Sequence, residues 1–167
     1  MDSDLILIGE GRNGKVYRLN DQQCLKVYNN LSHLQNELRV LQDAQRYPQF
    51  PRLYFHGENY MIRAYCPGPN AKQYLREHGF TPDFAAKLVE LLDIFKELNF
   101  TKLDCRLTHI IVTEEENLQV IDPARSMGTV CAIPKRMLKG LTRLGYADAF
   151  LRYVQQNRPD LYASWQP

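Results

Sequence analysis

Three glycines near the beginning of the chain have the spacing at which a backbone can contact phosphate groups. Gly9, Gly11 and Gly14 form the pattern G-x-G-x-x-G, and Lys15 and Val16 follow directly. Because glycine has no Cβ, the backbone N–H groups at such positions can approach phosphate oxygens closely. By itself the pattern identifies no single fold, because it occurs both in dinucleotide-binding folds and in ordinary glycine-rich hairpins.

The residues after the third glycine favour a strand. In a dinucleotide-binding fold that glycine opens a helix, and an acidic residue follows about 20 residues later. Here the β-favouring runs 15–19 and 24–28 flank Asn20-Asp21, which is a turn signal. We therefore expect the glycine loop to join two strands.

Two charged residues interrupt apolar patterns in the first third of the chain. Lys26 stands inside the run 24–28, and Glu37 shares a helical face with the leucines between residues 31 and 41. A carboxylate on an apolar face is costly unless it is paired, and Lys26 is the nearest candidate partner. Lys26 alone is better explained as an exposed strand residue, but the two exceptions together predict an ion pair.

Further polar residues lie around two short apolar runs later in the chain. Asp104 and Arg106 precede the run 110–112, and Asp122 follows the run 118–121. These residues are candidates for a functional site. A structural turn beginning at Asp122 is the alternative interpretation.

The two short runs predict a hairpin with an acidic turn between them. If the turn closes with Thr113 opposite Leu118, antiparallel pairing sets His109 opposite Asp122. An imidazole and a carboxylate would then lie side by side at the open end of the hairpin. A structural histidine is the alternative for His109 alone.

The elements that would position these residues change in character along the chain. Strands are expected first, with one helix among them that carries Leu31, Leu34, Leu38 and Leu41 and begins at Asn30 or Ser32. The expected strands are 5–8, 15–19, 24–28, 53–56 and 60–65. Mostly helices follow: one that begins at Thr81-Pro82 and continues to Leu98, and two more over 134–144 and 147–156. This order predicts an α+β protein whose two parts join near residues 63–68, where a ligand could bind.

Composition excludes several classes of protein. Lys and Arg number 21 against 19 Asp and Glu, a net charge of +2 that argues against a dedicated nucleic-acid binder. There is no apolar stretch of about 18 residues, and the first residues, Met1–Asp4, are acidic, so we expect no membrane segment and no secretory signal. Four scattered cysteines suggest neither a zinc site nor a redox motif. A cytoplasmic protein is expected.

Taken together, the motifs resemble the protein kinase-like superfamily over residues 5–125. The loop from Gly9 to Val16 is similar to the kinase glycine-rich loop, with Val16 at the position that lies over adenine. Cys24-Leu25-Lys26 resembles the strand that carries the phosphate-binding lysine, and Glu37 matches the helix glutamate that pairs with it.

The later motifs extend the resemblance. The stretch from Ile62 to Gly68 resembles the hinge between kinase lobes, whose backbone at Ala64 and Cys66 would contact adenine. The stretch from Asp104 to His109 is similar to the catalytic loop, and Asp122-Pro123-Ala124 stands where the D-F-G motif belongs. The nearest likeness is to short bacterial serine/threonine-kinase-like proteins, with the RIO and aminoglycoside kinases as more distant relatives.

This resemblance implies a bilobal fold, with a β-rich N-lobe over residues 1–63 and a truncated helical C-lobe over residues 64–167. It implies ATP and Mg²⁺ (or Mn²⁺) as cofactors, and transfer of the γ-phosphoryl group to a hydroxyl of a protein or a small molecule. The implied roles are phosphate binding by Lys26 held by Glu37, metal binding by Asp122 and His109, proton acceptance by Asp104, and charge neutralisation by Arg106.

Three departures from the kinase pattern leave alternatives open. Lys102 and Leu103 replace the His-Arg pair before the catalytic aspartate, so control by a phosphorylated activation loop is not expected. His109 replaces an asparagine, and neutral imidazole is a poor ligand for Mg²⁺. The chain after Asp122 is short and has no A-P-E motif. A regulatory nucleotide-binding pseudokinase and a small-molecule kinase therefore remain alternatives.

Overall fold

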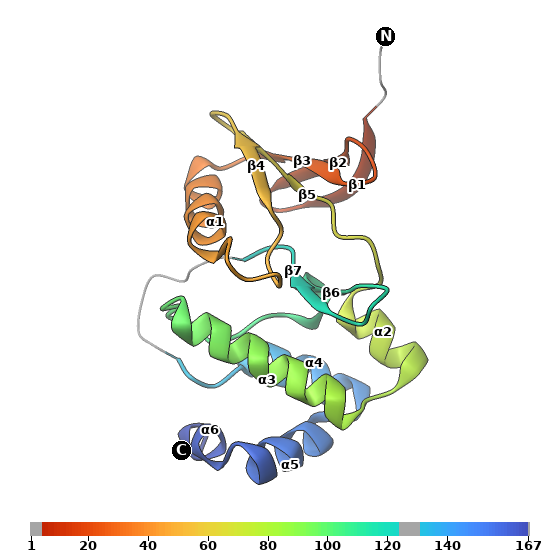
Figure 1. Cartoon of the computed structure of the whole chain (residues 1–167), viewed down its shortest axis with the longest axis vertical. Coiled ribbons are helices and arrows are strands. Elements are labelled where there is room, and N and C mark those ends of the chain that lie inside the picture. The colour runs from red at the N-terminus through yellow and green to blue at the C-terminus, as the bar shows by residue number, and fades with distance from the viewer. Residues whose placement is uncertain (1–4, 124–130, 167) are drawn as a thin grey trace. The chain divides into compact units, whose positions relative to one another are not determined.

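The structure of the chain, a computed structural model, describes residues 5–123 and 131–166, which form a mixed α+β protein (Figure 1). Met1–Asp4 and Ala124, which entered the sequence predictions, lie outside the described residues. No helix in the described part of the chain is long and apolar enough to cross a membrane.

The chain divides into two compact units. The first consists of residues 1–67 and 119–124, and the second of residues 68–118 and 125–167. The predicted boundary at residue 63 lies four residues before the observed division. The return of a late segment to the first unit was not predicted.

The first unit contains a five-stranded antiparallel sheet in the order β1-β2-β3-β5-β4. Its strands are β1 (Ile6–Gly11), β2 (Gly14–Arg18), β3 (Gln23–Tyr28), β4 (Leu53–His56) and β5 (Tyr60–Ala64). All five predicted strands are thus confirmed within a few residues. Gly14 begins strand β2 and no helix, so the glycine loop joins two strands, as predicted.

One helix, α1 (Leu31–Ala44), packs against β3 and β5 of this sheet (Figure 1). Asn30 caps it as predicted, by accepting a hydrogen bond from an N–H of the first turn. Glu37 is buried on the same apolar face as Leu34 and Leu41. The helix therefore carries a carboxylate into the interior of the first unit.

The second unit is mainly helical. Its helices are α2 (Ala71–His78), α3 (Pro82–Glu97), the 3₁₀ turn η1 (Leu107–His109), α4 (Lys135–Leu144), α5 (Ala147–Asn157) and α6 (Pro159–Ser164). The sequence predicted α3, α4 and α5. It did not predict α2 or α6, because α2 buries only two side chains and α6 buries none, so neither has a strong apolar stripe.

The apolar core of this unit forms around α3, which contacts α5. Phe84, Leu88, Leu92 and Phe95 are among its buried residues. The Trp165 ring lies 6.0 Å from the ring of buried Phe150, centroid to centroid. Trp165 therefore packs into the core of the second unit.

The predicted hairpin consists of β6 (Ile110–Val112) and β7 (Leu118–Val120), which form a two-stranded sheet. The division between the units falls inside β7. The turn closes with a 2.9 Å hydrogen bond from the N–H of Thr113 to the carbonyl oxygen of Asn117. Glu116 has a left-handed backbone conformation with φ of 59°, which tightens the turn.

This closure differs from the expected one by a residue. The sequence analysis set Thr113 opposite Leu118, whereas the bond joins it to Asn117. The register from which His109 was predicted to face Asp122 was therefore wrong, because a slip of one residue reverses the faces of a strand.

Candidate functional site

The predicted ion pair between Lys26 and Glu37 is present, and it has a third member. Lys26 Nζ lies 2.6 Å from Glu37 Oε2 and 2.9 Å from Asp122 Oδ1. The lysine comes from β3, the glutamate from α1 and the aspartate from the segment after β7. Three separate parts of the first unit, of which the aspartate segment is distant in sequence, thus meet at one ammonium group.

The two carboxylates differ in exposure. The side chain of Glu37 is 4% exposed and that of Lys26 is 8% exposed, whereas 30% of the Asp122 side chain reaches the surface. Glu37 can therefore orient the lysine but not meet a ligand, because its carboxylate is enclosed. Asp122 is the carboxylate of the pair that a ligand can reach.

Arg63 is a fourth member that the sequence analysis named only as part of the hinge-like stretch. It is buried in β5, its Nη2 donates a 3.0 Å hydrogen bond to the carbonyl oxygen of Ile121, and its Nε lies 4.0 Å from Glu37 Oε1. The signal was the one that singled out Lys26, a charged residue within an apolar strand. We call Lys26, Glu37, Arg63 and Asp122 the Lys26 cluster.

Backbone contacts hold the aspartate segment against the first unit. The N–H of Val120 donates to the carbonyl oxygen of Gln49 at 2.8 Å, and Gln119 Nε2 donates to that of Pro48 at 3.4 Å. With the bond from Arg63 to Ile121, these contacts fix the three residues before Asp122. The position of its carboxylate therefore follows from the backbone as well as from Lys26.

Burial affects the pKa values of residues in and beside the Lys26 cluster. Burial raises the pKa of Glu37 above its ordinary value, and the adjacent Lys26 and Arg63 act in the opposite direction. Burial also raises the pKa of Tyr28, whose ring centroid lies 4.9 Å from Lys26 Nζ. Two cations face two carboxylates, so the charges within the cluster balance.

The glycine-rich loop is the turn of the β1–β2 hairpin, and the space for a side chain differs among its three glycines. Gly14 has φ of +147°, and a Cβ there would lie 1.9 Å from the carbonyl oxygen of Val27, so the packing of β2 on β3 requires glycine. A Cβ on Gly11 would meet nothing within 4 Å, and one on Gly9 would make only ordinary contact with Val16. Strand packing thus explains Gly14 and leaves Gly9 and Gly11 unexplained.

The hinge-like stretch after β5 has its backbone donors partly occupied. The N–H of Ala64 donates to the carbonyl oxygen of Arg52 at 2.8 Å, so it cannot also serve an adenine ring. Among the described residues, no acceptor takes the N–H of buried Cys66. Of the two residues predicted to contact adenine, Cys66 therefore keeps a usable backbone donor.

Asp104, Arg106 and His109 belong to the second unit. Asp104 caps α4: its Oδ2 accepts the N–H of Arg136 at 2.8 Å, and its Oδ1 accepts the N–H of Met137 at 3.0 Å. The sequence analysis missed this role, because the capping residue is distant in sequence. Arg106 is exposed, and His109 is half-buried at the end of η1.

Asp122 and His109 are the predicted metal ligands. In the ranges 5–123 and 131–166, no group of three or more His, Cys, Asp or Glu side chains could hold a metal ion. Mg²⁺ is commonly bound by one or two carboxylates together with substrate phosphates, so the partly exposed Asp122 fits that use. His109, with a nitrogen donor, fits it poorly.

Comparisons with known proteins do not assign a family. No protein-family model matches the chain, and no curated protein matches it. The kinase-like resemblance therefore stays a prediction from the motifs.

Proposed function

We propose that this chain is an ATP-dependent phosphotransferase of the kinase-like type, with the first unit as its N-lobe and the second as a truncated C-lobe. The observation that carries the proposal is the position of Lys26 Nζ, 2.6 Å from Glu37 and 2.9 Å from Asp122. A buried lysine oriented by an enclosed carboxylate, next to an accessible one, can bind a phosphate chain and its metal ion.

Stability alone does not account for such a cluster. Bringing ions out of water is costly, and apolar residues of the same volume are often at least as stabilising as a buried ion pair. Charged groups held together with a partly exposed carboxylate are typical of binding and catalytic sites. The Lys26 cluster therefore supports a ligand-binding role for the first unit.

In this proposal the first unit binds the nucleotide. Lys26 contacts the α- and β-phosphates, Glu37 keeps its ammonium group in place, and Asp122 supplies an oxygen ligand to Mg²⁺. Bound Mg²⁺ neutralises the charge of the triphosphate. The backbone at Gly9 and Gly11 approaches the phosphates, since no neighbouring group explains the lack of a side chain there.

Residues of the second unit act on the acceptor. The acceptor hydroxyl oxygen forms a bond to the γ-phosphorus while the bond from that phosphorus to the bridging oxygen breaks, and ADP leaves. Asp104 takes the hydroxyl proton and Arg106 neutralises charge on the transferring group. Positioning and charge neutralisation supply most of the acceleration in such reactions.

One observation favours a second candidate function. Both carboxylate oxygens of Asp104 accept N–H groups of α4, so the proposed base also has a structural task. A regulatory protein that binds nucleotide without transferring phosphate needs the Lys26 cluster and this cap, but no general base.

Nucleotide binding is the first test. We expect ATP with Mg²⁺ to raise the melting temperature of the protein, equivalent to about 2.7 kcal/mol at a ligand concentration 100 times Kd. Lys26→Met and Asp122→Asn should remove most of this stabilisation. Arg39→Met, on the exposed face of α1, should not change it. A wild-type protein that millimolar ATP and Mg²⁺ fail to stabilise would refute the proposal.

Transfer is tested with γ-labelled ATP and a mixture of protein and small-molecule acceptors. Asp104→Asn is the informative variant, because asparagine keeps one acceptor for the cap but cannot take a proton. We expect it to bind ATP normally and to lose transfer by about a hundredfold or more. Stabilisation of the wild type by ATP without any transfer would favour the regulatory candidate instead.

A further inference from the structure

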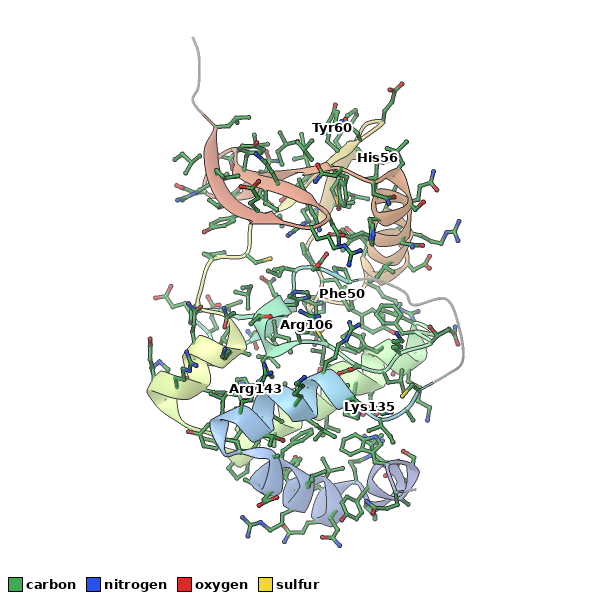
Figure 2. All side chains as sticks on the ribbon, turned by 180° about the vertical axis from the view of Figure 1, so that it is seen from behind. Phe50, His56, Tyr60, Arg106, Lys135 and Arg143 are labelled. Atoms are coloured by element: carbon green, nitrogen blue, oxygen red, sulfur yellow. The ribbon has the colours of Figure 1, made fainter. Side chains whose placement is uncertain are left out.

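All the charged residues on the exposed face of helix α4 are cationic. Its four charged residues are Lys135, Arg136, Lys139 and Arg143; all four are exposed, and the helix has no acidic residue. Figure 2 shows Lys135 and Arg143 at opposite ends of α4. The apolar face of α4 is not free to bind a ligand, because Met137 and Leu141 on this face are buried in the second unit.

Other exposed cations, such as Arg39 and Arg76, also lack an acidic partner among the described residues, but on α4 four of them lie on one helix. In the described part of the chain, none of the four has a carboxylate within ion-pair distance. By contrast, Lys87 pairs with Asp83, and Arg158 pairs with Asp93. Like charges three and four residues apart destabilise an isolated helix, so this arrangement carries a small cost.

The cationic face starts at the proposed proton acceptor. Asp104 accepts hydrogen bonds from the N–H groups of Arg136 and Met137, so its carboxylate lies at the first turn of α4. Further along the helix, Gly140 contacts η1 so closely that a Cβ would lie 2.9 Å from Leu107 Cδ1. Arg106, which directly precedes Leu107, is a fifth exposed cation beside this helix (Figure 2).

We propose that the phosphate acceptor is an acidic polypeptide segment, whose carboxylates bind along the basic face of α4 while its serine or threonine hydroxyl lies at Asp104. The role as acceptor rests on the proposed function, whereas the binding itself does not. Lys135 and Arg143 are about 12 Å apart along the helix axis, a span that about four residues of an extended peptide cover.

An acidic peptide fits this face better than the other polyanions. Single-stranded nucleic acid is commonly held by aromatic side chains among the cations, and α4 contains none. An anionic membrane would bind a helix whose apolar face is free, and here Met137 and Leu141 are buried. The whole chain has a net charge of only +2, so the attraction is local to this helix.

Binding is measured by fluorescence anisotropy with a labelled glutamate-rich peptide that contains one serine, compared with a glutamine-rich peptide of the same length. The test variant is Lys139→Glu with Arg143→Glu. The matched control is Arg76→Glu with Lys96→Glu, which makes the same charge change on exposed positions of α2 and α3. Circular dichroism and the melting temperature show whether each variant is folded.

We expect the wild type to bind the acidic peptide at least about tenfold more tightly than the neutral one, with an affinity that falls as salt is added. The α4 variant should lose about tenfold or more, and the control about twofold or less. Equal binding of both peptides, or equal loss in both variants, would overturn the inference. So would tighter binding of a single-stranded oligonucleotide or of phosphatidylserine vesicles.

The same peptides separate this inference from the proposed function. If the acidic peptide binds at α4 but receives no phosphate, the docking face stands and the phosphotransferase proposal fails. If both peptides are phosphorylated with equal kcat/KM, and the α4 variant leaves this unchanged, the docking inference fails and the phosphotransferase proposal stands.

Discussion

Two buried thiols flank the segment that is proposed to contact adenine. Cys24 Sγ lies 3.7 Å and Cys66 Sγ 3.9 Å from the same acceptor, the carbonyl oxygen of Ala64. Burial raises the pKa of both thiols above 9.0, and Arg63 opposes the shift. Both groups are therefore protonated donors at neutral pH, and they add no charge beside the Lys26 cluster.

The raised pKa values predict slow alkylation. The thiolate is the reactive form, so Cys24 and Cys66 should react with iodoacetamide at pH 8 at least about tenfold more slowly than the half-buried Cys131. Mass spectrometry of the labelled protein gives the three rates. In urea the rates should become similar. Folding should also become less favourable as the pH rises above 9.0, because the unfolded chain ionises first. Equal rates in the folded protein would contradict the burial of these thiols.

At the scale of elements, the β1–β2 hairpin combines a structural glycine with glycines that leave space. Gly14 lets β2 approach β3, because a side chain there would overlap the carbonyl oxygen of Val27. Gly11 has no neighbour that excludes a side chain, and its φ is not in the left-handed range. Substitutions at Gly14 and Gly11 can therefore test protein stability and ligand binding separately.

Two alanine substitutions test this separation. Gly14→Ala should destabilise the protein by about 3 kcal/mol or more, since it combines a strained backbone with overlap. Gly11→Ala should leave the free energy of unfolding nearly unchanged but weaken ATP binding by about tenfold, as its methyl group takes space that the phosphates need. Urea unfolding and calorimetric titration with ATP and Mg²⁺ give the two quantities. Unchanged affinity in Gly11→Ala would remove the glycine loop from the site.

At the scale of the whole molecule, the chain returns to its first unit after a long helical excursion. Residues 119–122 bind the first unit through Gln49, Pro48, Arg63 and Lys26. The pKa of Arg63 is raised: burial opposes its charge, but the adjacent carboxylate of Glu37 favours it. The charged guanidinium is thus favoured in the folded protein, and it links the sheet to the returning segment.

Arg63→Met should therefore loosen the segment. The substitution keeps a long side chain but leaves the carbonyl oxygen of Ile121 without its donor and removes one cation near Glu37. We expect a loss of about 3 kcal/mol in the free energy of unfolding and faster hydrogen exchange at Val120. Arg39→Met is the control and should change neither quantity. If exchange at Val120 is unchanged, Arg63 does not hold the segment.

Local patterns in the sequence were sufficient to predict most elements of the first unit. Alternation and turn residues predicted its five strands, and the leucine spacing with Asn30 predicted α1 and its cap. The ion pair between Lys26 and Glu37 was also predictable, because each residue breaks an apolar pattern and an unpaired buried charge is costly. These features depend on residues that are neighbours in the chain or on the same face of an element.

Only the tertiary structure decided which distant segments complete the site. The bond from Arg63 to Ile121, the contact of Lys26 with Asp122 and the capping of α4 by Asp104 each join residues that are far apart in the sequence. Periodicity shows which face of an element is buried but not which partner covers it. The hairpin register was likewise decided by one residue, Glu116, because its left-handed backbone closes the turn one position early.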